Sequence, residues 1–202
     1  MILAGALISI ACMAYRECGN PIVGSIAFSI GLVLVCILRA DLYTGKIGYA
    51  PFVEHDGCTR FQVSVVMAIM LILNLLTAAL LGALAPGFAP DKLAIPLLPA
   101  FGRAVLCGIL VFSAVEGWKR TKQIMAVAFP TAVFVLIGAE HCVADAFWIS
   151  AAGAWSLDAV LWLLVVAAGN SIGSIVTAKL VSMTLSVNNM ETAEAGKDGE
   201  KK

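Results

Sequence analysis

Charged residues are scarce in this sequence, and their scarcity argues against a soluble fold. Only 13% of the 202 residues are charged, whereas 61% are hydrophobic and the mean hydropathy is +0.97. Soluble domains contain about 25% charged and about 45–50% apolar residues. The composition therefore predicts an integral membrane protein.

The sequence also lacks net charge and paired cysteine motifs. Thirteen basic residues balance thirteen acidic ones, so the charge indicates neither a nucleic acid nor an anionic lipid surface as a partner. Six cysteines include no Cys-x-x-Cys pair, so no disulfide framework can be assigned. Cys12, Cys36 and Cys107 lie inside apolar runs, and we expect them to be small core residues.

No basic segment precedes the first apolar run. A signal peptide would begin with positive charges, and more apolar runs follow, so residues 1–15 are interpreted as the first membrane span. The predicted spans are residues 1–15, 22–38, 61–85, 98–115, 124–137 continued by 146–155, and 157–185.

Polar residues interrupt the second and fifth of these spans. The second stops at Arg39 and Asp41, and the apolar residues 47–53 that follow are too few to cross a membrane. The fifth is broken around Glu140 and His141. An interrupted helix is tolerated at membrane depth only where it is buried in protein or lines a water-filled cavity, and ionisable groups there usually mark a pathway.

The two halves of the chain repeat one another. Each has a helix, a broken helix and a long helix with one central asparagine, Asn74 or Asn170, which we expect to form hydrogen bonds between helices. Since three spans is an odd number, the second copy must be inserted upside down. Paired breaks in inverted halves predict a transport site at the membrane midplane.

The predicted fold is therefore an all-α membrane protein of six transmembrane helices. They form two inverted three-helix repeats whose second and fifth helices are broken. The predicted parts are a first repeat 1–85, a connector 86–97, a second repeat 98–185 and a disordered cytoplasmic tail 186–202.

Basic residues are distributed unequally between the two sides of the predicted membrane. With the N-terminus inside, seven lie in inner segments and three in outer ones, leaving out the break residues Arg39 and Lys46 and the span residue Lys179. This bias favours both termini in the cytoplasm. We expect a multi-pass protein of the cell inner (plasma) membrane. The inner residues are Arg60, Lys119, Arg120, Lys122, Lys197, Lys201 and Lys202, and the outer ones are Arg16, Lys92 and Arg103.

Three segments resemble motifs of the formate/nitrite transporter family. Residues 138–147, Gly-Ala-Glu-His-Cys-Val-Ala-Asp-Ala-Phe, are similar to the family's G-F-E-H-S-x-A-N-M-F. Residues 28–32 with 40–44 are similar to F-S-x-G-L and A-D-L-F-T, and 169–173 match G-N-x-x-G. The resemblance implies a homopentameric, aquaporin-like channel for small monovalent anions such as formate, nitrite or hydrosulfide, with protons and the lipid bilayer as its other partners.

The resemblance also implies roles for individual residues. His141 corresponds to a central pore histidine and Thr44 to the threonine that hydrogen-bonds it. The substrate pathway implied is His141, Thr44, Phe28, Leu32, Leu42 and Phe134, with Phe28 and Phe134 at one constriction. A neutral imidazole can donate a hydrogen bond to an anion, and a protonated one can pass it a proton so that it crosses as a neutral acid. Alternatively, His141 only braces the two breaks.

Supporting charges are predicted at the breaks: Glu140, Asp145, Arg39 and Asp41. Unpaired, they would be prohibitively costly, so we expect Arg39 to pair with Glu140 or Asp145. The carboxylates are not expected to bind substrate, because they repel anions.

Some positions depart from the family pattern. Asp145 stands where the family usually has asparagine, and Arg39 stands where a small residue is usual. A family lysine before the fourth span aligns with Pro96, Lys92 being the nearest candidate, and Phe112 replaces an asparagine. Arg39 is a candidate to compensate for the missing lysine.

Two alternative functions remain open at the sequence level. A membrane redox or metal enzyme would use His141 with Cys142, but neither this pair nor His55 with Cys58 has four-ligand zinc spacing. A neutral-solute channel is the other, although paired Asn-Pro-Ala breaks are absent. We predict no enzymatic activity, no metal and no cofactor.

Overall fold

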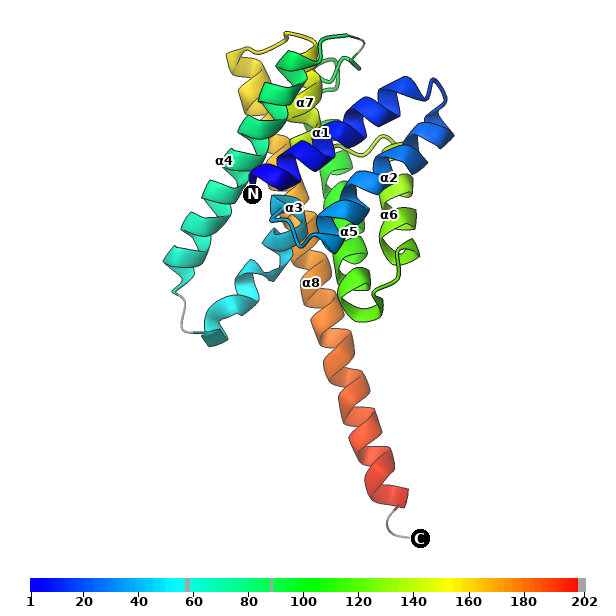
Figure 1. Cartoon of the computed structure of the whole chain (residues 1–202). Coiled ribbons are helices and arrows are strands. Elements are labelled where there is room, and N and C mark those ends of the chain that lie inside the picture. Colours follow the sequence, from blue (N-terminus) through cyan, green and yellow to red (C-terminus); the bar gives the residue numbers. More distant parts are fainter. Residues whose placement is uncertain (57–58, 88, 200–202) are drawn as a thin grey trace.

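The computed structural model describes residues 1–56, 59–87 and 89–199, and these residues are helical with short connections (Figure 1). The elements are α1 (Ile2–Glu17), α2 (Pro21–Ile37), α3 (Tyr43–Lys46), the 3-10 helix η1 (Ile47–Asp56), α4 (Arg60–Leu84), α5 (Leu97–Thr121), α6 (Met125–Leu136), α7 (Cys142–Ala151) and α8 (Leu157–Gly199).

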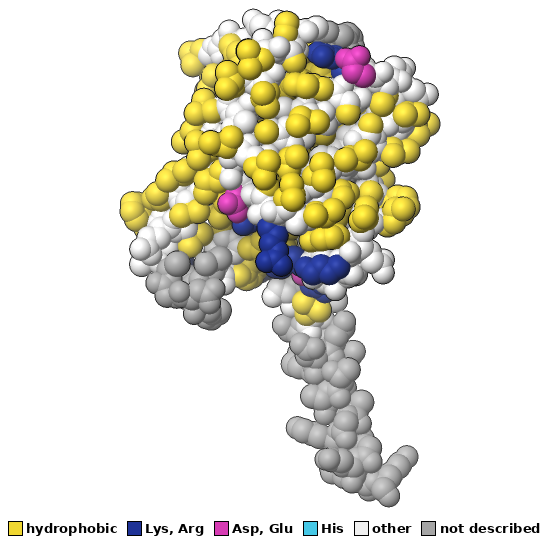
Figure 2. All heavy atoms as spheres, viewed as in Figure 1, with side chains coloured by type: hydrophobic (Ala, Val, Ile, Leu, Met, Phe, Trp, Pro, Cys, Tyr) yellow, Lys and Arg dark blue, Asp and Glu magenta, His cyan; other side chains and the backbone are white. Residues whose placement is uncertain are grey.

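This element order confirms the predicted membrane fold. Three helical segments are long and apolar enough to cross a membrane, namely α4, α5 and residues Leu157–Leu185 of α8. The second and fifth spans are each divided, into α2 and α3–η1 and into α6 and α7. Large apolar side chains cover the surface of the helical body (Figure 2), as expected for a protein surrounded by lipid.

Helix packing follows the inverted repeat. In the first half α1 packs against α2, whereas in the second half α5 packs against α6. The two halves are interlocked, because α4 packs against α7 and α8 packs against η1. Each long third helix therefore supports the second segment of the other half's broken span.

Both half-helices end in the same kind of turn. After α2, the N–H of Ala40 donates to the Val35 carbonyl, and after α6, the N–H of Ala139 donates to the Phe134 carbonyl, each at 2.9 Å. This is the Schellman arrangement, which places the preceding residue in the left-handed region. That residue is Gly138 (φ 68°) in one break and Arg39 (φ 53°) in the other.

Asn74 and Asn170 hold the two breaks in equivalent ways. Each side-chain oxygen accepts the N–H that opens the next segment, from Tyr43 at 2.8 Å or from Cys142 at 3.0 Å. Each amide group also donates to carbonyls of its own half: Asn74 to Asp41 (3.1 Å) and Met1 (2.8 Å), and Asn170 to Glu140 (2.8 Å) and Ala104 (2.9 Å). The prediction that these asparagines bond between helices is confirmed.

Three further sequence expectations concern the cysteines, the C-terminal segment and the pair His55 with Cys58. Cys12, Cys36 and Cys107 are buried, as predicted. The sequence predicts disorder from residue 186, whereas α8 continues through Gly199. Cys58 and the side chain of His55 lie outside the described residues.

Candidate functional site

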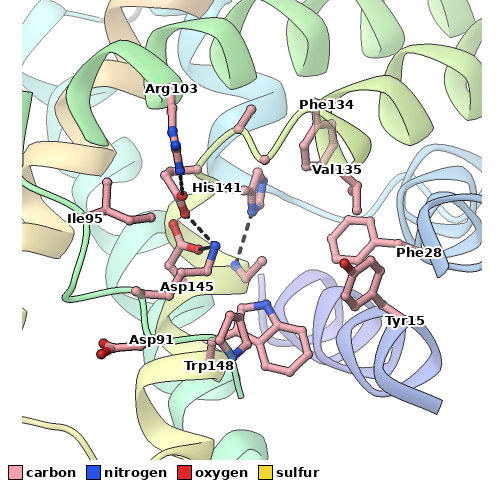
Figure 3. A pocket seen from close by; sticks show the side chains of 16 residues that line it. Tyr15, Phe28, Asp91, Ile95, Arg103, Phe134, Val135, His141, Asp145 and Trp148 are labelled. Atoms are coloured by element: carbon pink, nitrogen blue, oxygen red, sulfur yellow. Dashed lines mark hydrogen bonds and ion pairs between the residues drawn. The ribbon is translucent and has the colours of Figure 1, made fainter. Parts of the chain in front are cut away.

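A cavity of about 260 Å³, here called the histidine chamber, lies beside His141 (Figure 3). Side chains from α1, α2, α5, α6, α7 and the α4–α5 connection line it. Figure 3 shows Asp145 and Arg103 on one side and Phe28 with Phe134 on the other, with His141 between them. The lining residues are Tyr15, Phe28, Pro90, Asp91, Lys92, Ile95, Arg103, Phe134, Val135, Gly138, Ala139, Glu140, His141, Ala144, Asp145 and Trp148.

His141 is buried and both of its ring nitrogens are engaged. Nδ1 accepts the N–H of Ala144 at 3.2 Å and so caps the start of α7. A neutral imidazole whose Nδ1 accepts must carry its proton on Nε2. Nε2 lies 2.8 Å from the Thr44 hydroxyl and therefore donates to it. The structure thus brings together the two polar residues that the resemblance singled out.

Aromatic rings close one side of His141. Phe28 and Phe134 meet edge to face with their centroids 5.7 Å apart. The Phe134 ring also stacks on the imidazole, with the ring centroids 5.9 Å apart and an angle of 22° between the ring planes. Leu32 and Leu42 are fully buried, and neither lines the histidine chamber.

Lys92 is the cation that both buried carboxyl groups of this site contact. Its Nζ lies 2.6 Å from Glu140 and 3.2 Å from Asp145. Arg103 is a weaker third partner, 3.8 Å from Glu140. Burial lowers the pKa of Lys92, but the charges of Asp145 and Glu140 outweigh it, so its pKa stands above the ordinary value.

The predicted pairing of Arg39 with Glu140 or Asp145 is wrong. Each break has one residue with a left-handed backbone conformation, and the inverted repeat places these two residues at different cavities. Gly138 lines the histidine chamber, whereas Arg39 lines a second cavity. Asp41, the fourth predicted supporting charge, pairs with Lys46 instead.

The second cavity, here called the cationic chamber, has a volume of about 450 Å³. Four cations line it: Arg39, Lys46, Lys119 and Lys122. Its remaining lining residues are Val35, Cys36, Gly45, Tyr49, Ala50, Met67, Val115 and Trp118. Figure 2 shows Lys and Arg side chains gathered at the end of the body from which α8 projects.

Two of these cations are held in an unfavourable backbone conformation. Arg39 (φ 53°) and Lys122 (φ 57°) are the only non-glycine residues with positive φ in the described part of the chain. Neither has an ion-pair partner among the residues that the structure describes. Strained residues of this kind cluster at functional sites.

Sequence reasoning missed the role of Lys92 and the cationic chamber. Lys92 was only the nearest candidate for a family lysine aligned with Pro96, because an irregular connection has no periodicity that fixes where a side chain points. The available signal was that Lys92 is the one lysine in the proline-rich connector, residues 86–97. The cations of the second chamber come from two distant segments, the first break with α3 and the C-terminal end of α5, which only the folded chain brings together.

Comparisons with known proteins agree with this fold. The sequence matches the family described as formate/nitrite transporter over residues 1–184. No curated protein matches it significantly.

Two solved structures are similar. An "FNT family ion channel" has 22% identity and a TM-score of 0.82, over 91% of this chain and 87% of that one. A "pentameric formate channel with formate bound" has 21% identity and a TM-score of 0.56, over 94% of each chain. These likenesses show the fold alone. Because the family match spans nearly the whole sequence, the chain belongs to the formate/nitrite transporter family.

Proposed function

We propose that this protein is a channel or transporter for small monovalent anions of the formate, nitrite or hydrosulfide class, working passively or with a proton. The observation that carries the proposal is the position of His141. Its imidazole is buried where the two broken spans meet, at the wall of a chamber that also contains a pair of aromatic rings.

The proposed pathway runs along α2 from one chamber to the other. Phe28 lines the histidine chamber and Val35 lines the cationic chamber, while Leu32 lies between them and lines neither. Leu42, from the break, is buried and also lines neither chamber. We propose that these leucines, with Phe28 and Phe134, form apolar constrictions that exclude hydrated ions.

The cationic chamber supports the choice of an anion as substrate. Of the four cations around this cavity, Lys46 and Lys119 pair with Asp41 and Glu116, whereas Arg39 and Lys122 have no carboxylate partner among the described residues. Their unpaired charge concentrates anions from the adjoining solution. The N-terminus of α7, which begins beside His141, adds partial positive charge near the centre. Since loops rich in Lys and Arg stay in the cytoplasm, we propose that the cationic chamber opens there, in an inner (plasma) membrane.

We further propose that the chain assembles as a homopentamer. A similar solved structure is a pentameric formate channel, and this chain exposes large apolar side chains along α1, α2, α4, α6 and α8. Native mass spectrometry of the protein extracted in mild detergent would give five copies. A monomer under conditions that preserve bound lipid would contradict this assembly.

Flux into proteoliposomes tests the function directly. Formate, nitrite and hydrosulfide are each measured across a range of pH, with empty vesicles as the baseline. At least one anion should move faster than the baseline, and His141→Ala should alter that flux or its pH dependence. If none moves faster, the proposal fails.

Cys142→Ala is the matched control. Its side chain is buried next to His141 but lines neither chamber, so we expect little change in flux. A membrane redox or metal enzyme would instead lose its activity with Cys142→Ala and would bind a metal. Passage of urea at a rate similar to that of formate at every pH would favour a neutral-solute channel.

A further inference from the structure

The carboxyl group of Asp145 is buried and only half satisfied. The side chain is 2% exposed, and Oδ1 contacts Lys92 Nζ at 3.2 Å. Oδ2 is buried and has no hydrogen-bond partner in the described part of the chain. An ionised carboxylate oxygen in this position would have no donor to replace water, which disfavours the charged form.

Glu140 competes with Asp145 for the same cation. Its side chain is 1% exposed, and its nearer oxygen lies 2.6 Å from Lys92 Nζ. Arg103 is 3.8 Å away and half exposed, so its charge is screened by solvent. Two buried carboxyl groups that face one buried ammonium do not both ionise readily, because the second negative charge is unbalanced.

His141 is poorly placed to hold the extra proton. Protonation would turn Nδ1 into a donor, and the N–H of Ala144 would lose its acceptor at the start of α7. The remaining titratable or charged groups that face the carboxyl pair are the charged Asp91, Lys92 and Arg103 and the buried or chamber-lining Cys12, Tyr15, Cys107 and Cys142. With both buried carboxyl groups ionised, their two negative charges would face the single buried positive charge of Lys92, since Asp91 and Arg103 are exposed to solvent.

We propose that Asp145 and Glu140 share one exchangeable proton and form the proton-binding site of the histidine chamber. This proton neutralises the lining and allows a small anion to enter. Its role in transport rests on the proposed function, whereas its presence does not.

The proposed transfer balances without a further reactant. The O–H bond of the protonated carboxyl breaks, and its electron pair stays on the carboxylate oxygen. A new O–H or S–H bond forms on the anion, which leaves past Phe28 and Phe134 as a neutral acid. The carboxylate that remains faces Lys92 until a proton from water in the chamber restores the pair.

Infrared difference spectroscopy of the full chain in lipid tests the proton site without transport. A protonated carboxylic acid has a C=O band that a carboxylate lacks. We expect this band in the native sequence at neutral pH, and its loss in both Asp145→Asn and Glu140→Gln, since the single remaining carboxylate balances Lys92. Either variant is sufficient if the other does not fold. Glu17→Gln, which removes an exposed carboxylate on α1, should keep the band.

Absence of the band in the native sequence at neutral pH, or its survival in either folded variant, would overturn the proposal. Formate entry into proteoliposomes with a trapped pH indicator gives the second measurement. Above the titration midpoint, entry should slow by up to about tenfold per pH unit, since the occupancy of one proton site falls in that proportion. Asp145→Asn should flatten this dependence and reduce proton entry, and an unchanged slope would count against the site.

The two proposals can fail separately. If none of formate, nitrite and hydrosulfide moves but the infrared band behaves as expected, the transport function fails and the proton site stands. If anions move but the native chain has no band, the proton site fails and the transport function stands.

Discussion

The hydroxyl of Thr44 lies 2.8 Å from Nε2 of His141, and this contact joins the two broken spans. Thr44 belongs to α3, directly after the first break, and His141 precedes α7, directly after the second. Ser174 of α8 donates to the Thr44 carbonyl at 3.2 Å and fixes the backbone from the other side. The imidazole therefore has one orientation, set by partners from three elements.

Removal of the Thr44 hydroxyl should destabilise the protein. Thr44→Val keeps the shape of the side chain but leaves the buried Nε2–H without an acceptor, which costs about 1–3 kcal/mol. Thr44→Ser keeps the hydroxyl and serves as the control. Chemical unfolding of the two variants in the same detergent measures the difference. A Thr44→Val variant that is as stable as Thr44→Ser, or more stable, would contradict a stabilising role of this hydrogen bond.

Much of this architecture was accessible from the sequence, and the reason is chemical. Polar residues such as His141 and Asp41 within long apolar runs mark the breaks, because lipid tolerates no unsatisfied backbone there. The hydrogen bonds of Asn74 and Asn170 between helices could be predicted for the same reason, because a polar side chain in a membrane helix needs a partner. Contacts made by irregular segments were not accessible, because neither the direction of Lys92 nor the separation of Arg39 from Glu140 is encoded in any periodicity.

Loss of the Lys92 charge should be far more costly than loss of an equivalent surface cation. Lys92→Met leaves Glu140 and Asp145 buried without their shared counter-charge, and breaking such a pair costs about 3–5 kcal/mol. Lys46→Met is the matched control, since its partner Asp41 is 39% exposed and an exposed pair contributes about 0–1 kcal/mol. Similar losses in the two variants would show that Glu140 and Asp145 do not need the cation.

The pH dependence of Lys92 has a definite sign. Its pKa is raised in the folded protein, because the neighbouring carboxylates outweigh the effect of burial. Its contribution to stability is therefore complete below the unfolded pKa of about 10.4 and is lost as the pH rises through the higher folded value. Between pH 5 and 8 the native protein should show no loss attributable to Lys92. The difference in unfolding midpoint between the native protein and Lys92→Met, measured in detergent, should therefore persist across this pH range.

Arg39→Gly should increase stability while it weakens anion capture. Glycine adopts the left-handed conformation that arginine holds only at a cost, so unfolding should require up to about 1 kcal/mol more. Loss of the charge should slow anion entry from the cationic chamber, mostly at low ionic strength. Arg39→Lys keeps both charge and strain and is the control. A variant that is less stable than the native protein would assign Arg39 a structural contact instead.

Close packing of α5 against α8 gives the last prediction. A methyl group on Gly173 would lie 2.1 Å from the Val105 carbonyl oxygen and 3.0 Å from the Ile109 nitrogen, and these backbone atoms cannot yield as a flexible side chain could. Gly173→Ala should therefore destabilise by about 1–3 kcal/mol, the usual range for overpacking. Gly102→Ala, on α5 where nothing lies within 4 Å, should be neutral or stabilise by up to about 1 kcal/mol. Unfolding midpoints in detergent compare the two variants. If both shifted equally, helix propensity alone would explain them, and the close approach of α5 to α8 would be contradicted.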